Sequence, residues 1–126
     1  MIDKIAVIDD DEVYQMIISR YIEKSGMFKL AEFYQFPKEA LKYYSDNKEN
    51  LPSVMLLDIN MPLMDGWQFL EALQSQFPEV YDHTKIYIVT SSIAFSDKER
   101  FENFPKLAGF LSKPLNVDKL KEIGGR

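Results

Sequence analysis

Short apolar runs alternate with longer amphipathic segments along the whole chain, and this alternation limits its fold more than any other feature. Five runs are short and rich in β-branched and aromatic residues, as strands are. They cover residues 4–9, 28–35, 53–58, 85–91 and 108–112. No repeat, low-complexity tract or linker interrupts them, and a length of 126 residues suits a single domain over positions 1–126.

The segment after the first run has the period of a helix. Its apolar residues recur at three- and four-residue steps, and a glycine follows them. The stripe consists of Val13, Met16, Ile17 and Tyr21, and the glycine is Gly26. We predict an amphipathic helix with these four residues as its apolar face.

Four further helices are predicted from their start signals. Pro37 suits the first turn of the second helix, and Asp65 with Gln68 forms a capping box for the third. Ser96 is placed to cap a shorter fourth helix, and residues 116–123 form a fifth. Each predicted strand is therefore followed by a helix.

This order predicts an α/β fold with an open, doubly wound parallel sheet of five strands. Helices then cover both faces of the sheet. Right-handed crossovers restrict such a sheet to a few strand orders. Ligands bind beyond the carboxyl ends of the strands, where the winding reverses. The functional residues are therefore sought at the five strand ends.

Residues that can carry chemistry follow four of the five predicted strands. The second strand ends in Gln35 and Phe36, so a strand order of 2-1-3-4-5 would leave it at the edge. The other four ends would then meet in one small cleft. Their residues are Asp9, Asp10, Asp11, Asp58, Thr90, Ser91 and Lys113.

Three carboxylates from two neighbouring strands repel one another and need a cation. Hard oxygen ligands suit Mg²⁺, or Mn²⁺ in its place, whereas Zn²⁺ is disfavoured because nitrogen and sulfur ligands are lacking. A lysine and a hydroxyl nearby would bind the anion that the metal recruits, most naturally a phosphoryl group. Asp58 can then act as an aspartyl nucleophile.

Taken singly, these residues also have structural explanations. Asp10 or Asp11 can cap the first helix, the hydroxyls after the fourth strand can start a loop, and Lys113 can be an ordinary exposed lysine. Asp58 is explained poorly in this way, because it directly follows the apolar residues 54–57. The coincidence of charged and hydroxyl groups at four strand ends favours a site.

Composition argues against several other classes of function. The net charge is −5 and the 15 basic residues are scattered, which argues against direct binding of nucleic acid. No apolar run reaches the ~18 residues of a membrane span, and no signal peptide is recognised. Cysteine is absent, so we expect a cytoplasmic protein without disulfides or membrane contact. The one histidine, His83, is predicted in a solvated loop.

Four motifs at the strand ends resemble the receiver domain of two-component response regulators, in particular chemotaxis-regulator-like receivers. They read VIDDD, LLDINMPLMDG, IVTSS and GFLSKP and extend along the whole chain. The resemblance implies a flavodoxin-like sheet of order 2-1-3-4-5 and a phosphorelay role in signal transduction. It implies that Asp58 is the phosphoacceptor, and that the donor is a histidine kinase or a histidine phosphotransfer protein.

The resemblance also implies roles for the other site residues. Thr90 and Lys113 would bind the phosphoryl oxygens, and the small Ser91 would leave the phosphoryl group room to enter. The implied ligands of Mg²⁺ are Asp9, Asp10, Asp58 and the backbone carbonyl of Asn60.

Two implied features concern the last strand and the turn after it. The Lys113–Pro114 bond is expected to be cis, which only ~5–6% of X–Pro bonds are. Phe110 stands where the family often has tyrosine, and it would act as a switch by moving together with Thr90. An equally good explanation is that Phe110 is plain core.

Phosphorylation adds ~1.5–2 negative charges and would shift the population toward an active form. Residues 96–105, 108–112 and 116–123 would display the change to a downstream protein effector. The domain is expected to be a monomer, or a weak dimer when phosphorylated. Enzyme activity beyond Mg²⁺-dependent self-phosphorylation and self-dephosphorylation is not expected. A stand-alone receiver is predicted, with an N-terminal piece of a DNA-binding regulator as the alternative.

The main rival is an enzyme, a Mg²⁺-dependent phosphatase of the haloacid dehalogenase type. In that family's D-x-D-x-[TV] motif, Asp9 would be the nucleophile and Asp11 the acid/base. Such enzymes also need a late acidic pair, whereas Asp118 and Glu122 are separated on a helix. The rival leaves the segment DINMPLMDG unexplained.

Overall fold

The computed structural model describes residues 2–91 and 95–125. Within these residues, five parallel strands form one sheet in the order β2-β1-β3-β4-β5. The strands are β1 (Ile2–Ile8), β2 (Phe28–Tyr34), β3 (Val54–Leu57), β4 (Lys85–Thr90) and β5 (Gly109–Ser112). The predicted doubly wound fold and the strand order are confirmed.

Helices connect consecutive strands. In the described part of the chain they are α1 (Glu12–Ser25), α2 (Pro37–Asp46), the short 3₁₀ helix η1 (Lys48–Asn50), α3 (Gly66–Gln76), α4 (Val80–His83), α5 (Phe95–Glu102) and α6 (Val117–Gly124). The five predicted helices are present. α5 begins at Phe95, so Ser96 lies in its first turn and does not cap it.

The short helix α4 was not predicted. His83 is its last residue, so the loop predicted there is wrong, although the side chain is exposed as expected. The cause is Val80, which is fully buried and anchors this single turn against the core. One anchoring residue gives no helical period that a sequence could reveal.

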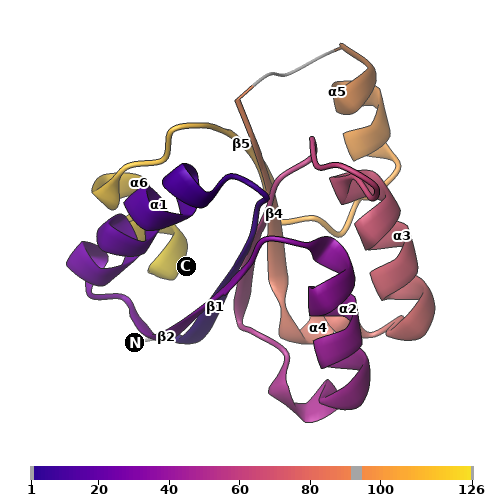
Figure 1. Ribbon diagram of the computed structural model, residues 1–126, viewed down its shortest axis with the longest axis horizontal. Helices are drawn as coiled ribbons and strands as arrows, with labels where there is room; N and C mark the ends of the chain where they lie inside the picture. Colours follow the sequence, from indigo (N-terminus) through magenta and orange to yellow (C-terminus); the bar gives the residue numbers. More distant parts are fainter. Residues whose placement is uncertain (1, 92–94, 126) are drawn as a thin grey trace.

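Helices cover both faces of the sheet, as Figure 1 shows. α1 and α6 pack against each other on one face, and α2, α3, α4 and α5 lie on the other. The sheet contributes Ile5, Val7, Leu56 and Val89 to the core under α1 and α6. It contributes Ile8, Met55, Leu57 and Ile88 to the core under the other helices. All four residues of β3 are buried, because helices pack on both of its faces.

Local signals set the helix ends as predicted. The Asp11 side chain caps α1 by accepting hydrogen bonds from two backbone N–H groups of its first turn, at 3.0 and 3.1 Å. Gly26 ends α1 with a left-handed φ of 66°. Pro37 occupies the first turn of α2, and Asp65 and Gln68 form the capping box of α3.

The apolar face predicted for α1 is wrong at three of its four residues, and only Tyr21 packs against the core as predicted. Val13, Met16 and Ile17 are 66%, 61% and 42% exposed. The face that packs against the core instead consists of Tyr14, Ile18, Tyr21 and Ile22. α1 carries apolar residues around most of its circumference, so more than one stripe fits a helical period, and the pattern alone does not say which one is buried.

Substitutions on the buried and exposed faces of α1 are expected to affect the free energy of unfolding differently. Ile18→Ala is expected to lower the free energy of unfolding by about 2–4 kcal/mol, because it leaves a cavity under the helix. Met16→Ala, on the exposed face, is expected to change it by less than about 0.5 kcal/mol. Urea unfolding of both variants measures the difference. Equal losses would contradict this assignment of the buried face.

Candidate functional site

The carboxyl ends of four neighbouring strands, β1, β3, β4 and β5, meet at one end of the sheet. Asp9 follows β1, Asp58 follows β3, Thr90 ends β4 and Lys113 follows β5. Backbone hydrogen bonds hold neighbouring ends together. The Asp58 N–H donates to the carbonyl of Ile8 at 3.0 Å, and the Lys113 N–H donates to the carbonyl of Thr90 at 2.9 Å. The backbone of the site is therefore an extension of the sheet.

Three carboxylates converge at this edge. Asp9, Asp10 and Asp58 each offer an oxygen, and these oxygens lie within 4.8 Å of one another. Asp9 is 2% exposed and Asp58 is 6% exposed, whereas Asp10 is half-buried. Asp9 also accepts a hydrogen bond from the backbone N–H of Asp11 at 2.9 Å. The donor set is made of hard oxygen atoms, which fits a divalent cation such as Mg²⁺.

Lys113 brings a positive charge into the same cluster. Its Nζ lies 2.6 Å from Asp9 Oδ2 and 3.7 Å from Asp58 Oδ1. Its side chain is 13% exposed, so water screens these contacts weakly. The three carboxylates thus carry more negative charge than Lys113 neutralises. The cluster therefore attracts a further cation, and that cation and Lys113 could together bind an anion.

The surroundings of Asp58 disfavour its charged form. Burial raises the pKa of the Asp58 carboxyl from 3.8 to about 6, and the negative charge of Asp9 adds to the effect. Lys113 acts in the opposite direction but does not cancel it. A bound cation, or a reaction that changes the charge of Asp58, will therefore relieve this unfavourable electrostatic energy.

The loop after Asp58 passes very close to the first turn of α3, and this requires a glycine. A Cβ on Gly66 would lie 2.5 Å from the carbonyl oxygen of Asp58 and 3.0 Å from Cα of Ile59. The Gly66 N–H donates to the carbonyl of Ile59 at 2.8 Å and closes the loop. Asn60 lies exposed in this loop. As predicted, Asp65 caps α3 and has a structural role.

The remaining predicted residues lie around the cluster. Thr90 is fully buried at the end of β4, and the adjoining Ser91 is exposed. Phe110 is half-buried in β5, and its ring meets that of Phe101 in α5 edge-on at 5.4 Å between centroids. The Lys113–Pro114 peptide bond is cis.

Tyr14 was missed by the sequence reasoning. Its ring centroid lies 4.2 Å from Nζ of Lys113, although the two residues are 99 positions apart. The available signal was its four-residue spacing from Ile18 and eight-residue spacing from Ile22, which places all three on one face of α1. The exposed stripe on the same helix obscured it.

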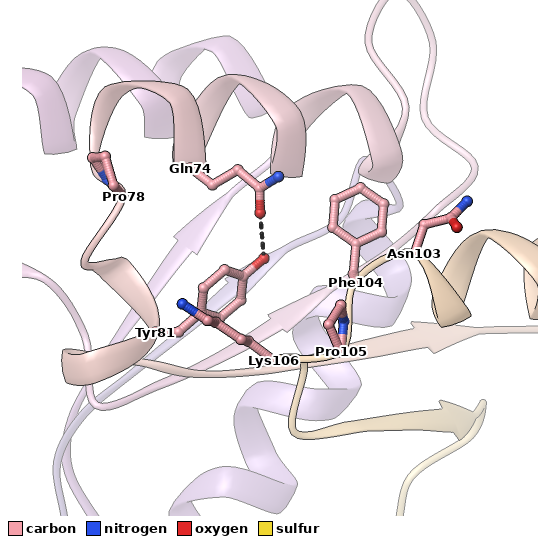
Figure 2. A pocket seen from close by; sticks show the side chains of 7 residues that line it. All are labelled: Gln74, Pro78, Tyr81, Asn103, Phe104, Pro105 and Lys106. Atoms are coloured by element: carbon pink, nitrogen blue, oxygen red, sulfur yellow. Dashed lines mark hydrogen bonds between the residues drawn. The ribbon is translucent and has the colours of Figure 1, made fainter.

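A groove of about 340 Å³ lies elsewhere and is not part of this site. Figure 2 shows its lining, with the hydroxyl of Tyr81 hydrogen-bonded to Oε1 of Gln74 at 3.0 Å. The groove is lined by Gln74, Pro78, Tyr81, Asn103, Phe104, Pro105 and Lys106. These residues precede β4 and β5, so the groove lies toward the amino ends of the strands, away from the carboxylates.

The fold and the strand-end cluster define a response regulator receiver domain. The sequence profile of this family matches residues 5–123, and the chain belongs to the family. It is thus a signalling domain of two-component systems, and the phosphatase alternative finds no support.

Individual relatives agree with this assignment. The chain is 30% identical over 115 residues to the DNA-binding transcriptional regulator NtrC of Proteus hauseri, covering 90% of this chain and 22% of that protein. A two-component response regulator from Legionella pneumophila is 32% identical, with a TM-score of 0.80 and coverage of 99% and 98%. A regulator from Cytophaga hutchinsonii shares the fold, with a TM-score of 0.89 at 21% identity and coverage of 98% and 95%.

The described helices contain no segment that is both long enough and apolar enough to cross a membrane.

The raised pKa of Asp58 makes a prediction for pH-dependent stability. The folded protein binds a proton at Asp58 more readily than the unfolded chain, so the charged carboxylate lowers stability above about pH 6. This loss disappears as the pH falls toward 4. Asp58→Asn carries no charge, so at about pH 7.5 without divalent cations it is expected to be more stable than wild type, by up to about 3 kcal/mol.

Denaturant unfolding of both proteins from about pH 4 to pH 8 measures this difference. The stability advantage of Asp58→Asn is expected to shrink steadily as the pH is lowered. A variant that is less stable than wild type at the upper end of this range would refute the assigned environment of Asp58.

Proposed function

We propose that Asp58 accepts a phosphoryl group from a phosphohistidine donor, and that this event switches the face formed by α5, β5 and α6 for binding a partner. The observation that carries the proposal is the environment of Asp58. It is a buried carboxylate at a strand end, with two carboxylates in cation-binding reach and Nζ of Lys113 at 3.7 Å. The charged form of such a carboxylate is destabilised, which favours cation binding and phosphorylation at this position.

The cation for this reaction is proposed to be Mg²⁺, with Mn²⁺ as a substitute. The ligands would be the carboxylates of Asp9, Asp10 and Asp58 and the backbone carbonyl of Asn60. Their hard oxygen atoms and their mutual closeness support this choice. When bound, the cation offsets negative charge on the carboxylates and on the incoming phosphoryl oxygens.

In the transfer, an oxygen of the Asp58 carboxylate forms a bond to phosphorus. The bond between phosphorus and the donor's imidazole nitrogen breaks, and its electron pair leaves with the imidazole. Lys113 neutralises charge on the phosphoryl oxygens, and the hydroxyl of Thr90 donates a hydrogen bond to one of them. Ser91 is small and exposed, so it leaves the approach open.

The conformational change is proposed to begin at Thr90 and to extend to α5. Movement of Thr90 toward the phosphoryl group would displace α5, which follows β4 in the chain. Phe110 then changes its surroundings, because its ring already contacts Phe101 of α5. The new arrangement is one of two pre-existing conformations whose populations change.

The proposed partners are a histidine kinase or a histidine phosphotransfer protein, and a downstream protein effector. The similarity to a hybrid signal transduction histidine kinase of Dictyostelium discoideum, 30% identical over 122 residues, supports a phosphorelay. We further propose a single cytoplasmic receiver domain over residues 1–126, without direct nucleic-acid or membrane contact. It would be a monomer or a weak dimer when phosphorylated, with no enzyme activity beyond its own phosphorylation and dephosphorylation.

The geometry disfavours the haloacid dehalogenase mechanism as well. That mechanism needs Asp11 as a free acid/base, but its carboxylate accepts two backbone hydrogen bonds as the cap of α1.

Phosphorylation by acetyl phosphate with Mg²⁺ tests the proposal. Wild type is expected to gain one phosphoryl group by intact-mass measurement, and peptide mapping is expected to locate it on Asp58. Asp58→Asn removes the nucleophile and is expected to gain none. Omitting Mg²⁺ or adding EDTA is expected to slow the wild-type reaction at least about 10-fold, because the carboxylate charges stay uncompensated.

Asp65→Asn is the matched control, because Asp65 lies in the same motif and asparagine also caps helices well. It is expected to be phosphorylated like wild type. The proposal fails if Asp58→Asn gains phosphate as wild type does while Asp9→Asn cannot.

A further inference from the structure

Among the described residues, three groups are found close to the ammonium group of Lys113, and one of them is an aromatic ring. Two are the carboxylates of Asp9 and Asp58, at 2.6 and 3.7 Å. The third is Tyr14, whose ring centroid lies 4.2 Å from Nζ. A cation at this distance over an aromatic face is attracted by the ring's quadrupole, and more strongly where water is excluded. The 13% exposure of the Lys113 side chain meets that condition.

The ring of Tyr14 has a fixed place in the fold. Tyr14 lies in the first turn of α1, where its backbone N–H donates to the capping carboxylate of Asp11 at 3.1 Å. Its side chain packs against the core under α1, as does that of Tyr21 about two helical turns later. Lysine, by contrast, has a flexible four-carbon stem. The fixed ring of Tyr14 can therefore restrict the position of Lys113 Nζ, whereas the flexible lysine side chain alone does not.

The hydroxyl of Tyr14 contributes nothing visible to this contact. It is buried and has no hydrogen-bond partner among the described residues. Burial, followed by the negative charges of Asp9 and Asp58, raises the pKa of this hydroxyl, so it stays protonated at neutral pH. The attraction for Lys113 therefore comes from the face of the ring.

We propose that Tyr14 is a positioning residue for phosphoryl transfer, whose ring holds Nζ of Lys113 between Asp9 and Asp58. This inference rests on the proposed function of Asp58. The shorter contact with Asp9 draws the ammonium group away from Asp58. The ring opposes free rotation of the stem and keeps water off Nζ, so Lys113 stays within reach of charge that develops on the phosphoryl oxygens.

Three variants separate the ring from its hydroxyl and from general packing. Tyr14→Phe keeps the ring and removes the unpartnered hydroxyl. Tyr14→Leu removes the ring. Tyr21→Leu removes a ring from the same helix and the same core, but one for which no contact with Lys113 is found among the described residues.

Proton NMR of the Lys113 side chain measures the contact without any reaction. Protons above an aromatic face shift upfield, so the Lys113 Hε signals are expected upfield in wild type, in Tyr14→Phe and in Tyr21→Leu. They are expected near their ordinary position in Tyr14→Leu. Unshifted Hε signals in the folded wild-type protein would overturn the inference, even if Tyr14→Leu does not fold.

The rate of Asp58 phosphorylation by acetyl phosphate with Mg²⁺ measures the consequence. Tyr14→Leu is expected to react about 10-fold more slowly, which is within the range of a desolvated cation–π contact. Tyr14→Phe and Tyr21→Leu are expected to stay within about 2-fold of wild type.

The outcomes distinguish the two proposals. If wild type is phosphorylated on Asp58 and Tyr14→Leu reacts equally fast, the positioning role is overturned and the proposed function stands. Equal slowing of Tyr14→Leu and Tyr21→Leu also overturns it, because packing alone would then explain the effect. If wild type gains no phosphate on Asp58, the proposed function fails, and the positioning role fails with it.

Discussion

The crowding of charge around Asp58 is the interaction on which the rest of the site depends. Asp58 is almost fully buried, and Asp9 lies in the same cluster; among the described residues, the ammonium group of Lys113 forms an ion pair with both. Burial of a like-charged pair is unfavourable unless cations are close. The sheet enforces the crowding, because parallel strands bring their carboxyl ends to one edge. The energetic cost is thus a consequence of the fold, and it makes Asp58 responsive to cation binding and phosphorylation.

The same edge of the sheet is linked to α5 through α3. Trp67 in α3 is buried, donates from Nε1 to Asp97 Oδ1 of α5 at 3.2 Å, and stacks on Phe104 with 5.5 Å between ring centroids. Asp65, the cap of α3, lies 3.9 Å from Arg100 of α5. α3 itself begins where Gly66 touches the backbone of Asp58. A displacement of α5 would therefore change its contacts with α3, whose first residue lies against the backbone of the proposed phosphoacceptor. These contacts could couple the site to α5 in the proposed switch.

Features governed by local sequence were predicted well, and features governed by long-range packing were not. The caps at Asp11 and Asp65 follow from neighbouring residues, and alternation with chirality restricts the sheet to a few strand orders. The particular order 2-1-3-4-5 came from the residues at the strand ends and from the family resemblance. The buried face of α1 was assigned wrongly at Met16, because apolar residues surround that helix. The contact between Tyr14 and Lys113 was missed, because no local pattern couples residues at opposite ends of the chain. The roles of the site residues came from chemistry at strand ends and from family resemblance, and they stay predictions.

The fold holds Asp58 in a site crowded with negative charge, where its ionisation is unfavourable until a cation binds. A ¹³C NMR titration of the Asp58 side-chain carboxyl, with and without Mg²⁺, measures this environment. The pKa of this carboxyl is expected to be about 6 without the metal ion and to decrease clearly when Mg²⁺ is added. A pKa close to the ordinary 3.8 that does not respond to Mg²⁺ would contradict it.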